Sequence, residues 1–133
     1  MKRQFADTSY YLALVNPQDM HHEKACEQSA ALGGAMITTA WVLMELGNFL
    51  SAAENRRLFL DLLSDLRNDA RVTIVPASVE LFEEGIALFA RRMDKNWSLT
   101  DCTSFVVMER HGLKQALTTD HHFAQAGFQV LLK

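Results

Sequence analysis

The chain has 133 residues and a net charge of −3, with 49% hydrophobic and 22% charged residues. This balance is typical of a compact globular protein; it excludes an intrinsically disordered chain and one that coats nucleic acid through a broad basic surface. The length suits one domain, so we expect a single domain over residues 1–133.

Short apolar runs alternate with longer helical patterns along the chain. VTIVP is rich in β-branched residues, as strands are, whereas NRRLFLDLLSDLRND spaces Leu and Phe as an amphipathic helix does. Such alternation predicts an α/β fold, in which helices flank a parallel sheet. In chain order we predict a strand at 4–6, helices at 8–15 and 19–32, a strand at 35–38, helices at 40–50 and 55–69, a strand at 72–76, helices at 78–93 and 98–112, and strands at 114–118 and 128–132.

Glu45 stands in the middle of the apolar helix AWVLMELGNFL, and no Lys or Arg occurs from Ala35 to Ala53. An ionised carboxylate without a partner is costly to bury. Glu45 is therefore expected to be neutral or bound to a cation, unless it lies at a partly exposed helix edge.

Three aspartates stand where predicted elements begin or end. Asp7 follows the first strand, Asp120 follows QALTT, and Asp101 opens the helix 98–112. Ligands of open parallel sheets bind beyond the carboxyl ends of the strands, which favours a functional role. Each aspartate also has a structural interpretation, because Asp7 and Asp120 suit helix N-caps and Asp101 suits a capping box with Ser98.

The four acids are more informative together than singly. Carboxylates gathered without basic partners repel one another, and some remain protonated at neutral pH unless a divalent cation binds. An all-oxygen site suits Mg²⁺ or Mn²⁺, whereas zinc favours His or Cys. Acidic clusters of this kind occur in phosphoryl-transfer enzymes, so we expect Asp7, Glu45, Asp101 and Asp120 to form a catalytic metal site.

Four segments, FADTSYYLAL, MELGN, SLTDCTSFVVM and ALTTDHHF, resemble those of the PIN-domain family in order and spacing. The likeness runs from about residue 4 to residue 131. Within the family, the chain most resembles the VapC-like ribonucleases, which are the toxins of type II toxin–antitoxin pairs. It implies a three-layer α/β/α sandwich around a mostly parallel five-stranded sheet, and a Mg²⁺- or Mn²⁺-dependent endoribonuclease that leaves 5′-phosphate ends. Asp7, Glu45 and Asp101 would hold the ion most directly, and Asp120 through water or a second ion.

Polar residues beside the acids are candidates for supporting roles. We expect four of them to orient ligands or water: Thr8, Ser9, Asn48 and Thr119. Arg91, Arg92 and Lys95 precede the Asp101 helix and are candidates for binding RNA phosphate without base specificity. The pairs His21-His22 and His121-His122 lack the i, i+4 spacing of a helical zinc site, and we expect them to be mostly solvated. The alternative for His121 or His122, which follow Asp120, is a contact with RNA or phosphate.

The resemblance also implies partners: an RNA substrate, a small antitoxin protein and a second copy of the chain in a homodimer. Part of the apolar surface of Trp41, Phe49, Phe59 and Leu63 is expected to form these protein contacts. The alternative is a catalytically silent PIN-fold module that binds and sequesters RNA or a protein partner.

The sequence also predicts a cytoplasmic location. The apolar run that follows the basic start MKRQF is short and is interrupted by Asp7, so neither a signal peptide nor a membrane span is expected. Cys26 and Cys102 fit no zinc spacing and are too few for a disulfide framework, so we expect reduced thiols.

Overall fold

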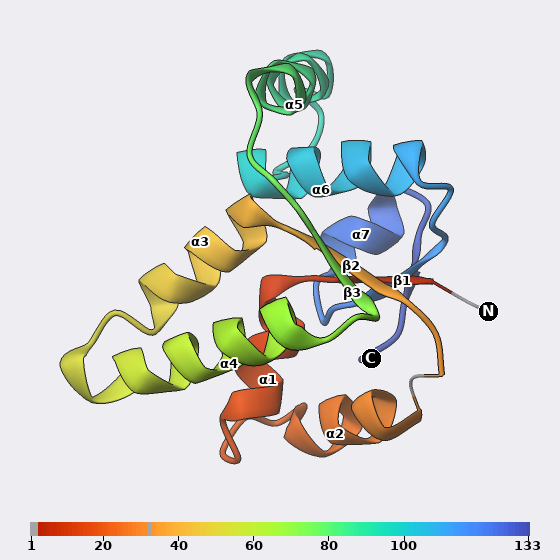
Figure 1. Cartoon of the computed structure of the whole chain (residues 1–133). Coiled ribbons are helices and arrows are strands. Elements are labelled where there is room, and N and C mark those ends of the chain that lie inside the picture. Colours follow the sequence, from red (N-terminus) through yellow and green to blue (C-terminus); the bar gives the residue numbers. More distant parts are fainter. Residues whose placement is uncertain (1–2, 32) are drawn as a thin grey trace.

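The computed structural model describes residues 3–31 and 33–133 as a five-stranded sheet with helices on both faces (Figure 1). Its elements in chain order are β1 (Gln4–Ala6), α1 (Thr8–Val15), α2 (His22–Ala31), β2 (Met36–Thr39), α3 (Ala40–Phe49), the 3₁₀ helix η1 (Ala53–Asn55), α4 (Arg56–Asn68), β3 (Val72–Val75), α5 (Val79–Arg91), α6 (Leu99–Arg110), β4 (Gln115–Leu117), α7 (His121–Gln125) and β5 (Gln129–Val130).

The sheet has the strand order β3-β2-β1-β4-β5, and its four pairings are parallel. In the central strand, Phe5 lies opposite Ile37 of β2 on one side and opposite Ala116 of β4 on the other. Since parallel strands end at the same edge, Asp7 after β1 and the segment Thr118–Asp120 after β4 become neighbours there. The predicted α/β fold with a five-stranded parallel sheet is confirmed.

Helices cover both faces of the sheet. In Figure 1, α6 and α7 lie above the strands, with α5 packed outside α6, while α1, α2 and α4 lie below. The core between these layers contains fully buried large side chains, among them Phe5, Tyr11, Leu46, Met108 and Phe123. No helix in the described ranges is both long enough and apolar enough to cross a bilayer.

Most predicted elements appear with shifts of one to three residues at their ends. Helix α2 starts at His22 rather than at residue 19, because Asp19 forms a turn in which its Oδ1 accepts a hydrogen bond from the His21 amide at 2.8 Å. The predicted end of that helix, Leu32, lies outside the described residues. Helix α7 and η1 were not predicted, since five and three residues are too few to reveal a helical period.

Candidate functional site

A cavity of about 370 Å³ opens at the carboxyl edge of the sheet. The residues that line it come from α1, α3, the segment before α6, α6 itself and the start of α7. None of the described residues that line it is Lys or Arg. All four predicted acids contribute to the wall, which includes Asp7, Thr8, Ser9, Glu45, Asn96, Ser98, Asp101, Thr119, Asp120 and His122. The cavity with this lining is called the acidic cavity below.

Asp7 stands at the N-cap position of α1, but among the described residues neither the Ser9 nor the Tyr10 amide donates the usual capping hydrogen bond to its side chain. Its Oδ2 instead accepts hydrogen bonds from the hydroxyls of Thr118 at 2.8 Å and Ser9 at 3.3 Å. The side chain is almost fully buried, with 5% of the residue exposed. Asp7 is thus held at the edge of the sheet by hydroxyl groups, and its side chain does not cap the start of α1.

Asp101 is fixed by the capping box predicted for α6. The Ser98 hydroxyl accepts a hydrogen bond from the Asp101 amide at 3.0 Å, and Asp101 Oδ2 accepts one from the Ser98 amide at 3.1 Å. The same oxygen lies 3.1 Å from Nδ1 of His122. Its capping role does not remove Asp101 from the acidic cavity, because the same residue also lines the cavity wall.

Asp120 caps the short helix α7, with its Oδ1 accepting a hydrogen bond from the His122 amide at 2.9 Å. Thr118 links this acid to Asp7, since its hydroxyl donates to Asp7 and accepts a hydrogen bond from the Asp120 amide at 3.0 Å. One threonine hydroxyl therefore sets the relative positions of two acids that are far apart in the sequence.

Glu45 reaches the acidic cavity from α3. Val42, Leu43 and Leu46 of this helix are buried in the core, while Glu45 is half-buried on the side that faces the cavity. The helix is anchored at its start by Thr39, whose hydroxyl accepts a hydrogen bond from the Val42 amide at 3.1 Å. Glu45 is thus placed by the packing of its apolar neighbours.

The electrostatics of the cavity favour a bound cation. Burial raises the pKa of Asp7 to about 7, and the nearby charges of Asp101 and Glu45 add to this rise, against the hydrogen bonds from Thr118 and Thr8. Burial likewise raises the pKa of Asp101, and the charge of Asp120 contributes. A divalent cation would offset both effects, and its preference for oxygen ligands matches this set of carboxylates and hydroxyls.

The spacing of the ligand atoms adds a constraint. Among the described residues, three side chains bring their potential ligand atoms within 4.8 Å of one another: Asp120, His121 and His122. The four carboxylates share one cavity but are more widely spaced than this group. Such spacing suits coordination that is partly through water, as Mg²⁺ prefers.

Some predicted supporting residues lie elsewhere. Asn48 is exposed and is not among the described residues that line the acidic cavity, although it follows Glu45 by three positions. Arg91, Arg92 and Lys95 also lie outside its wall and line neighbouring pockets. Thr8, Ser9 and Thr119 do line it, and Ser9 also accepts a hydrogen bond from the Thr119 amide at 3.0 Å.

Four further residues of the site were not singled out as site residues: Asn96, Ser98, Thr118 and His122. Ser98 was predicted only as a cap, and His122 as a mostly solvated residue with a contact to RNA or phosphate as the alternative. The signal for Thr118 was present in the sequence, because a hydroxyl two residues before an acid at a strand end can bind the neighbouring backbone and side chains. His122 was missed because α7, which orients it, is too short to predict.

The chain resembles known proteins over nearly its whole length. Residues 5–129 match the family model described as PIN domain. The chain is 29% identical over 124 residues to a protein of Mycobacterium tuberculosis named 23S rRNA-specific endonuclease VapC20, covering 93% of this chain and 94% of that protein.

Solved structures show the same likeness. The crystal structure of Mycobacterium tuberculosis VapC20, described as a sarcin-ricin loop cleaving toxin, matches with a TM-score of 0.85 at 28% identity, over 93% of this chain and 95% of that one. FitAcB of Neisseria gonorrhoeae matches with a TM-score of 0.66 at 18% identity, over 96% and 95% of the two chains. At that identity the second likeness concerns the fold alone.

Proposed function

The chain belongs to the PIN-domain family, and from this premise we propose that it is a divalent-metal-dependent endoribonuclease, the toxin of a toxin–antitoxin pair. One observation carries the proposal: four carboxylates line a single cavity in whose described lining no Lys or Arg occurs, and the pKa of the most buried carboxylate is raised to about 7. Such an arrangement is unfavourable at neutral pH until a cation binds. The likeness to VapC20 supports RNA as the substrate and a toxin as the role.

Each acid has a distinct part in this proposal. Asp7, Glu45 and Asp101 hold a Mg²⁺ or Mn²⁺ ion, and Asp120 contributes through water or to a second ion. When bound, such an ion stabilises negative charge on phosphate oxygens and lowers the pKa of water. The hydroxyls of Thr118 and Ser9 keep Asp7 turned toward the cavity.

Ser98 and His122 support Asp101. The capping box fixes the rotamer of the Asp101 carboxylate, and the His122 ring lies between this acid and Asp120, at 3.1 Å and 3.4 Å from their oxygens. A positioned imidazole at this place favours the ionised form of Asp101, which is the form that binds a metal.

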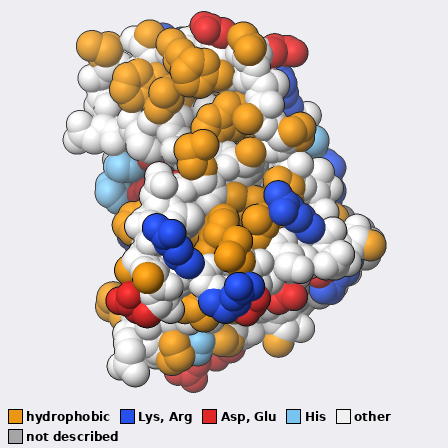
Figure 2. All heavy atoms as spheres, turned by 60° about the vertical axis from the view of Figure 1, so that its left-hand side comes forward, with side chains coloured by type: hydrophobic (Ala, Val, Ile, Leu, Met, Phe, Trp, Pro, Cys, Tyr) orange, Lys and Arg blue, Asp and Glu red, His pale blue; other side chains and the backbone are white. Residues whose placement is uncertain are grey.

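The proposed protein partners are an antitoxin and a second copy of the chain. A groove of about 520 Å³ lies between α1, α3 and the start of α4, lined by apolar side chains that include Leu12, Val15, Phe49 and Leu58. Figure 2 shows hydrophobic side chains gathered at the top of one face, where α5 lies, and again near its middle. Trp41, Phe59 and Leu63 pack against the core, so of the four apolar residues predicted to form contacts Phe49 is the exposed one, at 64%.

The test is cleavage of RNA by the purified chain. We expect Mn²⁺-dependent endonucleolytic cuts with 5′-phosphate ends in a panel of structured RNAs that includes large-subunit ribosomal RNA. EDTA should abolish these cuts and added Mn²⁺ should restore them. Absence of cleavage over the whole panel, with RNA still bound, would instead establish the alternative, a catalytically silent PIN-fold binding module.

A further inference from the structure

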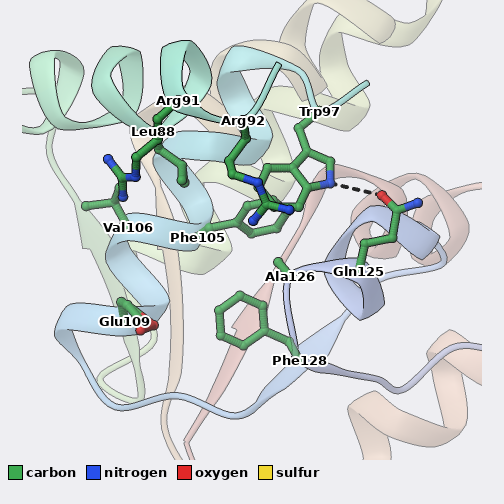
Figure 3. Close-up of a pocket in the computed structure, with 10 residues that line it drawn as sticks. All are labelled: Leu88, Arg91, Arg92, Trp97, Phe105, Val106, Glu109, Gln125, Ala126 and Phe128. Atoms are coloured by element: carbon green, nitrogen blue, oxygen red, sulfur yellow. Dashed lines mark hydrogen bonds between the residues drawn. The ribbon is translucent and has the colours of Figure 1, made fainter. Parts of the chain in front are cut away.

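A second cavity, called the side pocket here, lies between α5, α6 and the turn from α7 to β5 (Figure 3). Its volume is about 230 Å³, and its wall includes Arg91, Arg92, Trp97, Phe105, Ala126 and Phe128. We propose that this pocket binds one unstacked nucleotide of the RNA substrate, next to the phosphate that is cleaved. The inference rests on the proposed endoribonuclease function and extends it to how the substrate is held.

The side pocket adjoins the acidic cavity. Trp97 stands between Asn96 and Ser98, both of which line the acidic cavity, and Gln125 follows His122 by about one turn of α7. The indole Nε1 of Trp97 donates a hydrogen bond to Gln125 Oε1 at 3.0 Å, and this contact joins the segment before α6 to the end of α7 in the lining of the side pocket (Figure 3). A strand that passes the acids can therefore place a neighbouring nucleotide in the side pocket.

Aromatic rings form the apolar part of the pocket. Phe105 packs edge-on against Trp97, with 5.0 Å between ring centroids, and lies 5.8 Å from Phe128. Figure 3 shows Phe128 and Ala126 on the opposite side from the two arginines, so the space between them is bounded by flat groups. Unstacked RNA bases bind between aromatic rings and arginine guanidinium planes in this way.

Arg92 supplies a preordered plane on the other side. Its guanidinium lies 4.8 Å from the centroid of the Trp97 ring, and it makes two hydrogen bonds to Asp94, at 3.0 Å and 3.1 Å. Because Asp94 offsets its charge, Arg92 serves mainly as a stacking surface. Its orientation is already set before a base enters.

Arg91 supplies the charge for a phosphate. It is exposed at the end of α5 and forms no ion pair with any described residue. Glu109 lines the pocket away from the Trp97–Gln125 hydrogen bond (Figure 3). There its carboxylate would repel phosphate but could accept hydrogen bonds from the N–H groups of a base edge. Cationic, aromatic and hydrogen-bonding groups in one pocket match a nucleotide better than an apolar peptide side chain.

The experiment measures binding, so it does not depend on cleavage. The full chain carrying Asp101→Asn is titrated with fluorescein-labelled octaribonucleotides of A, C or U, and with an abasic octamer of the same ribose-phosphate backbone. We expect the base-bearing octamers to bind about tenfold more tightly than the abasic one, as one stacked base typically provides. Ala126→Leu fills the pocket and should reduce this preference to near one, whereas Ala124→Leu, at an exposed position of α7 two residues earlier, should leave it intact.

A second variant tests the charged rim. Arg91→Ala should weaken binding of base-bearing and abasic octamers alike and reduce the salt dependence by about one phosphate contact, whereas Arg57→Ala on α4 should not. A folded Ala126→Leu variant that keeps the tenfold preference, or an unchanged salt dependence in Arg91→Ala, would overturn the proposal. If the wild type cleaves RNA and either of these results is obtained, the nucleotide pocket is rejected and the endoribonuclease function stands. If the wild type does not cleave RNA, the endoribonuclease function is rejected instead.

Discussion

At the scale of single residues, Asp7 and Asp101 show how one residue type is used in two ways. Both stand at helix starts, but Asp101 closes a capping box while Asp7 is bound by the hydroxyls of Thr118 and Ser9. Asp101 therefore combines a stabilising contact with its proposed metal contact. The hydrogen bonds to Asp7 offset only part of the cost of burying its charge, because its pKa is still raised to about 7, so the two acids should respond differently to substitution.

Asp7→Asn should change the pH dependence of stability. In the absence of metal, the pKa of Asp7 is about 7 in the folded protein against 3.8 for the unperturbed carboxyl group. Between these values the folded state binds a proton that the unfolded state has released, so the free energy of unfolding falls as the pH rises from about 4 to about 7. Asp7→Asn removes this loss and should be more stable than the wild type at pH 8 by roughly 2–4 kcal/mol in EDTA.

Urea denaturation at pH 4, 6 and 8 measures this difference. The two proteins should have similar stability at pH 4 and diverge above it, while Asp65→Asn on the exposed face of α4 should follow the wild type throughout. Parallel stability curves for Asp7→Asn and the wild type would show that Asp7 is already ionised without a metal.

For Asp101 we predict that Asn and Ala substitutions separate catalysis from capping. Asn keeps an oxygen that can accept the hydrogen bond from the Ser98 amide, so the stability of Asp101→Asn should stay within about 0.5 kcal/mol of the wild type. Its rate of RNA cleavage should fall by at least about 100-fold. Asp101→Ala should lose cleavage equally and also about 1 kcal/mol of stability, because the capping box opens. Cleavage rates in Mn²⁺ and urea midpoints measure the two effects; near-normal cleavage by Asp101→Asn would remove this residue from the catalytic site.

At the scale of elements, the sequence predicted what depends on periodicity and missed what depends on short contacts. The amphipathic helices α4 and α5 were predicted because apolar spacing reveals them. Helix α7, and with it the place of His122, depends on a single cap by Asp120. Asn48 was expected beside Glu45 on helix spacing alone. The spacing does not show that Asn48 is exposed and lies outside the described lining of the cavity.

The contact between α5 and α6 is close enough to exclude a side chain at Gly85. A Cβ at this position would lie 2.6 Å from Cγ2 of Thr103, which is buried and holds its hydroxyl to the Thr100 carbonyl at 2.8 Å. Gly85→Ala should therefore destabilise the protein by about 1–3 kcal/mol, despite the better helix propensity of Ala. Thermal denaturation followed by circular dichroism measures the change.

Gly47→Ala is the matched control, since a Cβ there would make an ordinary contact of 3.4 Å with the Phe59 ring. It should be neutral or stabilise the protein by up to about 1 kcal/mol. Equal melting temperatures for the two variants would mean that α5 and α6 can move apart without cost.

At the scale of the whole molecule, the site exists only when the fold is complete. Its four acids come from the ends of β1 and β4 and from α3 and α6, and parallel pairing around the central strand brings them to one edge. A ligand that binds all of them must therefore stabilise the entire fold, because the unfolded chain holds the acids apart.

Mn²⁺ should accordingly raise the stability of the wild type, and do so in a pH-dependent way. Binding at 100 times the dissociation constant adds about 2.7 kcal/mol to the free energy of unfolding. Because protons compete for Asp7 below a pKa of about 7, the stabilisation by a fixed Mn²⁺ concentration should be larger at pH 8 than at pH 6. Asp101→Asn should lose most of this stabilisation and Asp65→Asn none, as measured by thermal denaturation with and without Mn²⁺. If Asp101→Asn gains as much as the wild type, the ion binds elsewhere, and the cluster of acids at the sheet edge is not the metal site.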